Sequence, residues 1–251
     1  MRRCVVTVAT GRFIPGQDRL LAALKQQPKF VANKAWRTSP AHWPSHQDKP
    51  YAFKAYALQA AAEFYDNDAL LLWCDACIIP VRDMEPLWEK IERDGAVFMN
   101  NGWRNTEWTA ESAYPDLFPE LFARTAPSAE YWHRHARMQN WKIKHTVGGF
   151  FGLNVKHPTG AAILQDFYRL ASETNAFVGP WWNSNNPEYR TRPGAAPCGP
   201  PDVRGHRHDQ TALSVLAWRY GIKLTYCPEF FIYGKPEDAT DPRTVAVAAG
   251  F

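Results

Sequence analysis

Residues 69–77 read Ala-Leu-Leu-Leu-Trp-Cys-Asp-Ala-Cys, an apolar run that ends in a carboxylate between two cysteines. An unbroken apolar run of this length is typical of a strand buried on both faces, as in a parallel sheet. Asp75 stands where this strand leaves the sheet, and ligands of open α/β sheets bind outside the carboxyl ends of the strands. A buried carboxylate is costly unless it binds something. The stretch therefore predicts a ligand site at Asp75, unless Asp75 only begins the turn before Pro80.

Strand and helix patterns alternate on both sides of this run. Residues 3–9 are apolar and β-branched, and residues 50–65 form the clearest helix pattern, with Asp48 as the expected N-cap and Pro50 in the first turn. Further helices are expected at 17–26, 84–93, 158–173 and 209–220, and further strands at 96–99, 142–155 and 222–227. This order predicts an α/β fold with a mostly parallel central sheet flanked by helices. The sequence shows neither an internal repeat nor a clear linker, so we expect a single domain over residues 1–251.

The composition is that of a globular protein, with 45% apolar and 22% charged residues. No apolar run approaches the ~18 residues of a membrane span, and residues 4–9 are too short for the apolar part of a signal peptide. Five cysteines, an odd number in a chain with no export signal, favour reduced thiols over a disulfide scaffold. We therefore expect a cytoplasmic protein without a transmembrane segment.

Basic residues are concentrated in the first fifth of the chain. Residues 1–50 contain nine Lys and Arg against only Asp18 and Asp48, although the whole chain has a net charge of just +4. Such a segment favours a phosphate-bearing partner, either a nucleotide or, less favoured, a nucleic acid; the alternative is a solvated basic surface. Thr10-Gly11-Arg12 directly follows the first strand and is a candidate phosphate loop, although neither a GxGxxG fingerprint nor a P-loop motif is present.

A second polar group stands at residues 206–210, His-Arg-His-Asp-Gln, directly before the helix expected at 209–220. Asp209 suits an N-cap, and a helix start attracts anions, so this run is either a functional site or a simple cap. The preceding residues 175–207 are rich in Pro, Gly and Asn, and irregular segments of this length are often lids over active sites. Trp181 and Trp182 in this segment can stack on an acceptor, or can instead be anchored in the core.

Two further motifs require an explanation. Gly148-Gly149 lies within the strand pattern at 142–155, which indicates either a bulge or a close approach of the backbone to a ligand. Cys74 and Cys77 have the spacing of a zinc or redox pair, but a structural zinc site usually needs a second pair. In an extended segment these two side chains also point to opposite faces. Metal–thiolate chemistry is therefore the weaker interpretation of this pair.

The order of these features resembles that of GT-A-fold glycosyltransferases, particularly the family 8-like and the capsular or lipopolysaccharide transferases. The likeness spans roughly residues 3–235 but rests on short motifs: Lys49-Pro50, the run 70–77 with Pro80 after it, Gly148-Gly149-Phe150, and His208-Asp209-Gln210. It implies a single GT-A-like, Rossmann-type domain. Residues 1–100, approximately, would bind the nucleotide, and residues 101–251 the sugar and the acceptor. The implied activity is transfer of a sugar from a nucleotide-sugar donor to a hydroxyl group.

The resemblance also implies a divalent cation. Asp75 matches the first carboxylate of the family's Asp-x-Asp motif, which binds manganese or another divalent ion that bridges the donor's diphosphate. Cys77 stands where the second carboxylate is expected, and a neutral thiol is a poor ligand for a hard cation. Mn²⁺ or Mg²⁺ is therefore the expected cofactor, with Asp75 as its ligand. Alternatively the metal site is completed elsewhere, is weak, or is replaced by basic side chains such as Arg12.

Residue roles follow from the same comparison and from the motifs above. Asp209 and Gln210 match the pair beside the reacting sugar in retaining members, so they are the expected catalytic residues. Tyr233-Gly234-Lys235-Pro236 keeps a fragment of the family's C-terminal phosphate-binding run, but the family's histidine is missing. The expected donor-binding residues are Thr10, Gly11, Arg12, Lys54, Asp75, Gly148, Gly149 and Lys235, and the expected acceptor-binding residues are Trp181, Trp182, His206 and His208.

Three hypotheses about function remain open at this point. The first is a glycosyltransferase whose acceptor is a glycan, a lipid-linked saccharide, a protein or a modified nucleobase, with nucleic acid allowed but not favoured. The second is a nucleotide-sugar-binding protein of the same fold with weak or no catalysis, which the thiol at Cys77 would fit. The third is a thiol or zinc protein that uses Cys74 and Cys77.

Overall fold

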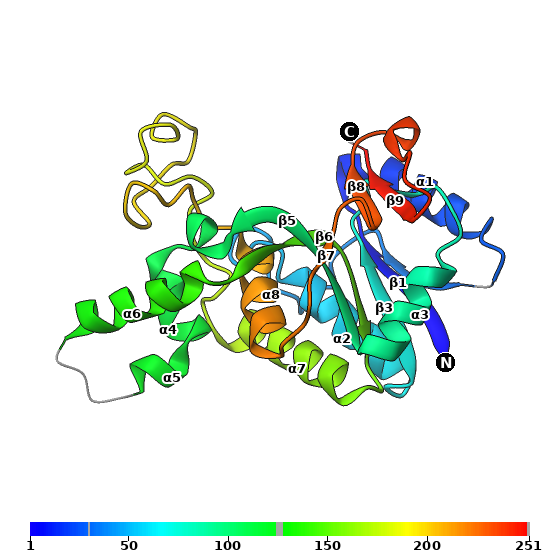
Figure 1. Cartoon of the computed structure of the whole chain (residues 1–251), viewed down its shortest axis with the longest axis horizontal. Helices are drawn as coiled ribbons and strands as arrows, with labels where there is room; N and C mark the ends of the chain where they lie inside the picture. Colours follow the sequence, from blue (N-terminus) through cyan, green and yellow to red (C-terminus); the bar gives the residue numbers. More distant parts are fainter. Residues whose placement is uncertain (30, 124–127, 250–251) are drawn as a thin grey trace.

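The computed structural model describes residues 1–29, 31–123 and 128–249. Within these ranges, six strands form the central sheet in the order β2–β1–β3–β6–β5–β7 (Figure 1). The strands are β1 (Arg2–Val8), β2 (Ala32–Trp36), β3 (Ala69–Cys74), β5 (Ala96–Arg104), β6 (Lys144–Asn154) and β7 (Thr225–Tyr226). Among these six described strands, β6 runs antiparallel to its neighbours β3 and β5. The pairs β1–β2, β1–β3 and β5–β7 are parallel. The expected mostly parallel α/β sheet is confirmed.

Helices cover both faces of this sheet. On one face lie α2 (Phe53–Phe64), α7 (Pro158–Glu173) and α8 (His208–Arg219), and on the other lie α1 (Ile14–Leu24) and α3 (Glu85–Asp94). Strand β3 divides its side chains between the two layers with the strand's period of two. Leu71 and Trp73 pack with the first group of helices, whereas Leu70 and Leu72 pack with the second. The run is thus buried on both faces, as its composition predicts.

A smaller sheet extends the core beside the carboxyl ends of the central strands. It has the order β4 (Ile78–Pro80), β9 (Thr244–Ala248) and β8 (Phe230–Tyr233), and β9 and β8 are the red and orange strands of Figure 1. Strand β4 follows directly on the turn that contains Asp75. Phe231 stacks on Phe150 of the central sheet with ring centroids 5.3 Å apart, which ties the two sheets together.

Shorter elements fill the region between β5 and β6. They are α4 (Tyr114–Leu117), α5 (Pro119–Phe122) and α6 (Ala129–Trp141), with 3₁₀ turns η2 (Asn105–Trp108) and η3 (Glu111–Ala113); η1 (Gly11–Phe13) follows β1 and η4 (Pro236–Asp238) follows β8. None of the helices in the described part of the chain is long and apolar enough to span a membrane.

Residues 174–207 contain no helix and only a single isolated β-bridge, and Figure 1 shows most of this segment as a yellow projection. The segment is nevertheless tied together around the buried side chain of Asn183. Its amide nitrogen donates hydrogen bonds to the carbonyl oxygens of Gly199, Pro200 and Val203. The irregular conformation is confirmed, and the Asn183 side chain holds it together with backbone hydrogen bonds such as those from Asn183 to Arg204 and from Ala196 to Trp182.

Some expected boundaries are wrong. Helix α2 begins at Phe53 rather than Pro50, because Tyr51 has a positive φ of 62° that interrupts the helical path. Asp48 does not cap it, and its carboxylate instead accepts a hydrogen bond from Ser45 at 2.6 Å. The strand expected at 222–227 shrinks to β7 (Thr225–Tyr226), and the strand expected at 96–99 extends to Arg104 in β5. Strand β6 continues unbroken through Gly148 and Gly149.

Candidate active site

Three charged side chains from distant parts of the sequence meet at the carboxyl end of β3. Lys54 lies in the first turn of α2, Asp75 directly follows β3, and Asp209 lies in the first turn of α8. The ammonium nitrogen of Lys54 is 3.1 Å from Asp75 Oδ1 and 2.9 Å from Asp209 Oδ2. It also donates a hydrogen bond of 2.8 Å to the carbonyl of Gly148. One buried ammonium group therefore holds two carboxyl groups against the edge of the sheet.

Neighbouring groups fix the two carboxyl groups in place. The indole N–H of Trp73 donates to Asp75 Oδ1 at 2.7 Å, and the backbone N–H of Asp75 donates to the carbonyl of Gly149 at 2.9 Å. Asp209 is the second residue of α8 and is not its cap: the N-cap is Arg207, whose side chain makes no capping hydrogen bond. The expected capping role of Asp209 is therefore wrong. Its carboxylate instead points to Lys54, at the end of the helix whose dipole favours a negative charge.

The two glycines of β6 make room for these carboxyl groups. A Cβ atom at Gly148 would lie 2.6 Å from Asp209 Oδ2, and a Cβ atom at Gly149 would lie 2.8 Å from Asp75 Oδ2. The pairing of β5 with β6 also shifts here, so that Phe98 opposes Phe151 but Asn100 opposes Thr146. Both readings of the Gly-Gly motif, a bulge and a close approach, are therefore met, and the groups that approach are the two carboxylates.

The pKa values of Asp209 and Lys54 are both raised, but for different reasons. Burial raises the pKa of Asp209 to about 6; the positive charge of Lys54 opposes this shift and the negative charge of Asp75 adds to it. Burial alone would lower the pKa of Lys54, but the two carboxylates outweigh it and raise that pKa above its ordinary value. Lys54 therefore stays a cation at neutral pH, whereas Asp209 can exchange a proton near neutrality.

A small pocket of about 70 Å³ opens onto this cluster. It is lined by Tyr51, Lys54, Asp75, Trp181, Arg207, His208, Asp209 and Gln210. Trp181 closes part of it, with its ring 5.6 Å from that of Tyr51 and 4.5 Å from that of His208. Sites for drug-sized ligands usually measure ~300–1,000 Å³. The pocket thus admits only a small group unless the residues around Trp181 move.

Arg207 lines the same pocket and lies among three tryptophans. Its guanidinium carbon is 4.0 Å from the ring centroid of Trp108, 4.9 Å from that of Trp182 and 5.7 Å from that of Trp181. Within the described ranges no carboxylate forms an ion pair with this group, and its side chain makes no hydrogen bond. Its burial lowers its pKa. Arg207 belongs to the polar run 206–210 but is not among the residues expected to form the site.

No family model and no curated protein matches this chain. Solved structures similar to it include a glycosyltransferase involved in the glycosylation of the major capsid of PBCV-1, 11% identical over 98% of this chain and 93% of that chain, with a TM-score of 0.49. Mouse xyloside xylosyltransferase 1 is 10% identical over 99% and 97%, with a TM-score of 0.47. The glycosyltransferase GlyE of Streptococcus pneumoniae TIGR4 is 10% identical over 91% and 46%, with a TM-score of 0.43. Since all three scores are below 0.5, the function has to rest on the chemistry of the pocket.

The two histidines of the run 206–210 are both buried but differ in position. His206 does not line the pocket: its Nδ1 accepts a hydrogen bond from the N–H of Ala110, so its Nε2 carries the proton and donates to the carbonyl of Ala176. Burial lowers the pKa of His206 to about 4 and that of His208 to about 3, so both rings are neutral. His208 does line the pocket, beside Gln210. The structure thus places His206 where it supports the irregular segment.

Several expected donor- and acceptor-binding residues lie outside this pocket. Thr10, Gly11 and Arg12 are exposed at the end of β1 and do not line it. Lys235 is also exposed, with its ammonium group 3.9 Å from Glu237. Trp182 stacks on Tyr189 with ring centroids 5.0 Å apart. It contacts the guanidinium of Arg207 but does not line the pocket. The structure therefore brings together Lys54, Asp75, Gly148, Gly149, Trp181, His208, Asp209 and Gln210, but not the remaining expected residues.

The side chains around Asp75 do not fit a hard divalent cation. The described residues contain no group of three or more His, Cys, Asp or Glu side chains that could hold a metal ion. Asp75 is already bonded to Lys54 and to Trp73, and burial raises the pKa of Cys77 to about 11, so its thiol is protonated. Burial raises the pKa of both Cys74 and Cys77, which disfavours the thiolate that zinc binding and redox chemistry need. The Mn²⁺ or Mg²⁺ ion implied by the resemblance stays a prediction.

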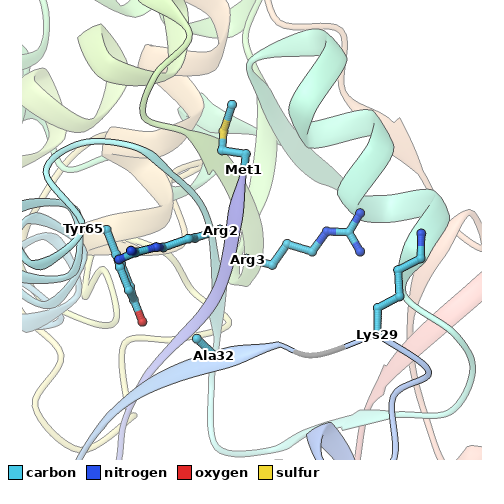
Figure 2. A pocket seen from close by; sticks show the side chains of 6 residues that line it. All are labelled: Met1, Arg2, Arg3, Lys29, Ala32 and Tyr65. Carbon is cyan, nitrogen blue, oxygen red and sulfur yellow. The ribbon is translucent and has the colours of Figure 1, made fainter.

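A larger hollow of about 560 Å³ lies at the amino end of β1 (Figure 2). It is lined by Met1, Arg2, Arg3, Lys29, Ala32 and Tyr65. Glu85 pairs with both Arg3 and Lys29, and the guanidinium of Arg2 lies 5.5 Å from the ring centroid of Tyr65. Arg3 and Lys29 thus share one carboxylate and Arg2 lies against a ring, and this end of β1 is opposite to the end where parallel strands present ligand sites.

Proposed function

We propose that this protein transfers a sugar from a nucleotide-sugar donor to a hydroxyl group of an acceptor. The observation that carries the proposal is the buried Lys54 bridging Asp75 and Asp209 at the carboxyl end of β3. Such a cluster presents carboxylate oxygens, which suit sugar hydroxyl groups, at the edge of an α/β sheet where ligands bind. The aromatic ring of Trp181 at the mouth of the pocket suits the flat face of a sugar.

In this proposal, Asp209 is the residue that handles the proton. Transfer forms a bond between the acceptor oxygen and the anomeric carbon, breaks the bond from that carbon to the donor phosphate, and releases the proton of the acceptor hydroxyl. A carboxylate with a pKa of about 6 suits a general base near neutral pH. Gln210 lies beside it in the pocket and would orient the sugar, and Asp75 would hold the donor.

A second candidate is a nucleotide-sugar-binding protein without catalysis. The observation that favours it is the engagement of both carboxylates by Lys54, together with the protonated thiol at Cys77. The two candidates share the same ligand and the same pocket. They differ only in whether the donor is turned over.

The test is a panel of UDP-, GDP-, CDP- and ADP-sugars, assayed for binding and for hydrolysis or transfer, with EDTA and with added manganese. We expect Asp75→Asn to weaken donor binding, and Asp209→Asn to slow turnover by about a hundredfold or more while donor binding is mostly kept. Asp18→Asn, which removes only an exposed partner of Arg37, is the matched control and should leave both unchanged. Binding without turnover in the wild type would favour the second candidate, and no binding of any sugar nucleotide would exclude both.

A further inference from the structure

The pocket contains one charged side chain that forms no ion pair with any of the described residues. Of its two cations, Lys54 is engaged by both carboxyl groups, whereas Arg207 is ion-paired to none of the described residues. Arg207 is partly buried, and its immediate neighbours are tryptophan rings. Ring faces stabilise the positive charge, but they leave the five N–H groups of a guanidinium without ordinary hydrogen-bond acceptors.

The tryptophans also hold this group in a defined place. Rings on several sides restrict the rotamers of a long side chain, so less conformational entropy is lost when a ligand binds. A guanidinium fixed in this way presents parallel N–H groups that match two oxygens of a phosphate. Arg207 is in addition the N-cap of the twelve-residue helix α8, whose positive end adds to the attraction for an anion.

We propose that Arg207 binds a phosphate group of the ligand, so that this pocket neutralises phosphate with a side chain instead of a divalent metal ion. The site deepens the proposed function and rests on it, because a sugar nucleotide carries a diphosphate. Lys54 offsets the repulsion from Asp75 and Asp209, the two negative groups that line the pocket. Both carboxylates of the pocket are paired with Lys54, the thiol of Cys77 is protonated, and the described residues contain no group of three or more metal-binding side chains, so no competing site for a hard cation is evident there.

Two sources of phosphate share this chemistry: the diphosphate of the donor and a phosphate carried by the acceptor. The test titrates inorganic pyrophosphate, the four nucleoside diphosphates and glucose 6-phosphate into the full chain in EDTA, and repeats each titration with manganese. Arg207-dependent binding of pyrophosphate and a nucleoside diphosphate identifies the donor as the source. Arg207-dependent binding of glucose 6-phosphate alone identifies the acceptor.

We expect saturable binding in EDTA, weakened by about tenfold to a hundredfold in Arg207→Gln and by less in Arg207→Lys, which keeps the charge but not the two-pronged geometry. Arg192→Gln is the matched control, because Arg192 also lies over Trp182, at 5.3 Å, but does not line the pocket. Circular dichroism and thermal unfolding verify that each variant is folded. Should Arg207→Gln fail to fold, weaker phosphate binding by Arg207→Lys, together with unchanged binding by Arg192→Gln, still supports the proposal, and unchanged binding by Arg207→Lys overturns it.

The proposal is overturned if the Arg207 variants bind every phosphate compound as the wild type does, if binding appears only with manganese, or if none of these compounds binds. Failure of the proposed function looks different. Turnover of a sugar nucleotide that is indifferent to Arg207→Gln removes this inference and keeps the function. Arg207-dependent binding of pyrophosphate without binding or turnover of any sugar nucleotide removes the function and keeps the anion site.

Discussion

At the scale of single residues, the site depends on the placement of Lys54. A buried ammonium is costly in itself, and the two carboxyl groups and the Gly148 carbonyl that surround it offset that cost. Removing one partner of such a buried pair commonly destabilises a protein by about 3–5 kcal/mol, because the other charge is left uncompensated. The same contacts that stabilise the fold therefore position the groups that we propose to act on the sugar.

Gly148→Ala should damage the site through steric overlap. A Cβ atom 2.6 Å from Asp209 Oδ2 forces the carboxylate away from Lys54, and overpacking of this kind costs about 1–3 kcal/mol. We expect lower stability in urea unfolding together with a loss of turnover. Gly221→Ala is the control, because Gly221 has a φ of +67° with open space around it. The control should lose about 1–2 kcal/mol from backbone strain and keep its activity; equal activity in both variants would contradict this explanation.

The pH dependence should report Asp209 directly. Its pKa is raised to about 6 by burial, above the ~3.9 of an unfolded chain, so the folded state binds this proton more tightly. Between about pH 4 and pH 6 this group therefore lowers stability as the pH rises. In urea unfolding across this range, the free energy of unfolding of the wild type should fall as the pH rises, and Asp209→Asn should lose this part of the pH dependence. Turnover should rise as the pH increases through about 6, since the base must be ionised. An identical pH dependence of stability in both proteins would contradict the assignment.

At the scale of elements, the irregular segment 174–207 brings Trp181 and Arg207 to the pocket. It has no regular ladder of backbone hydrogen bonds; scattered backbone hydrogen bonds hold it, and the Asn183 side chain adds three connections within the segment. The carboxamide oxygen of Asn183 also accepts hydrogen bonds from the N–H groups of Asn185 and Cys198. Because the pocket measures only about 70 Å³, the proposed binding of a sugar nucleotide predicts that this segment moves like a lid.

Asn183→Ala should loosen the segment without unfolding the sheet. Each buried hydrogen-bond partner left unsatisfied costs about 1–3 kcal/mol, and here the affected carbonyls belong to one local segment. We expect faster tryptic cleavage at the exposed Arg190 and Arg192, slower turnover, and a thermal transition of the core that changes little. Asn185→Ala, which removes an exposed side chain with one hydrogen bond to Gly199, is the control. Donor should slow cleavage in the wild type, and a rate that ignores both donor and mutation would exclude a lid.

At the scale of the whole molecule, the sheet separates two apolar layers and leaves its chemistry at one edge. The layer with α1 and α3 continues into the small sheet, and the layer with α2, α7 and α8 carries Lys54 and Asp209 to the carboxyl end of β3. At the opposite end of β1, the basic groups Arg3 and Lys29 are paired with Glu85. The buried charge cluster lies at the carboxyl end of β3, whereas the cations at the amino end of β1 share one carboxylate.

A nucleoside diphosphate should stabilise the whole molecule against heat. At one hundred times the dissociation constant, a ligand that binds only the folded state adds about 2.7 kcal/mol, and each ~1 kcal/mol raises the Tm of a chain of this size by about 2–4 °C. We expect at least one of UDP, GDP, CDP and ADP to give such a shift in EDTA. The matching nucleoside, which has no phosphate, serves as the control. No shift from any diphosphate, with or without manganese, would exclude the donor site.

Much of the fold is readable along the chain because its signals are local. The apolar run 69–77 indicated a buried strand with Asp75 at its end, the predicted helix at 158–173 coincides with α7, and the Gly-Gly pair indicated a close approach. These features depend on periodicity, apolar composition and the absence of a Cβ atom, which neighbouring residues express on their own. The same local logic misplaced the start of α2, since the positive φ of Tyr51 leaves no local signal.

The site itself was decided by tertiary structure. Lys54, Asp75 and Asp209 come from three separate parts of the fold, and only the strand order and the packing of α2 and α8 on one face bring both carboxylates to within about 3 Å of the Lys54 ammonium. Arg207 acquired its tryptophan surroundings, and His206 its burial, in the same way. Contacts between residues far apart in sequence depend on how the whole chain closes around its core. A local pattern therefore identifies the residues able to do chemistry, and the tertiary fold selects those that meet.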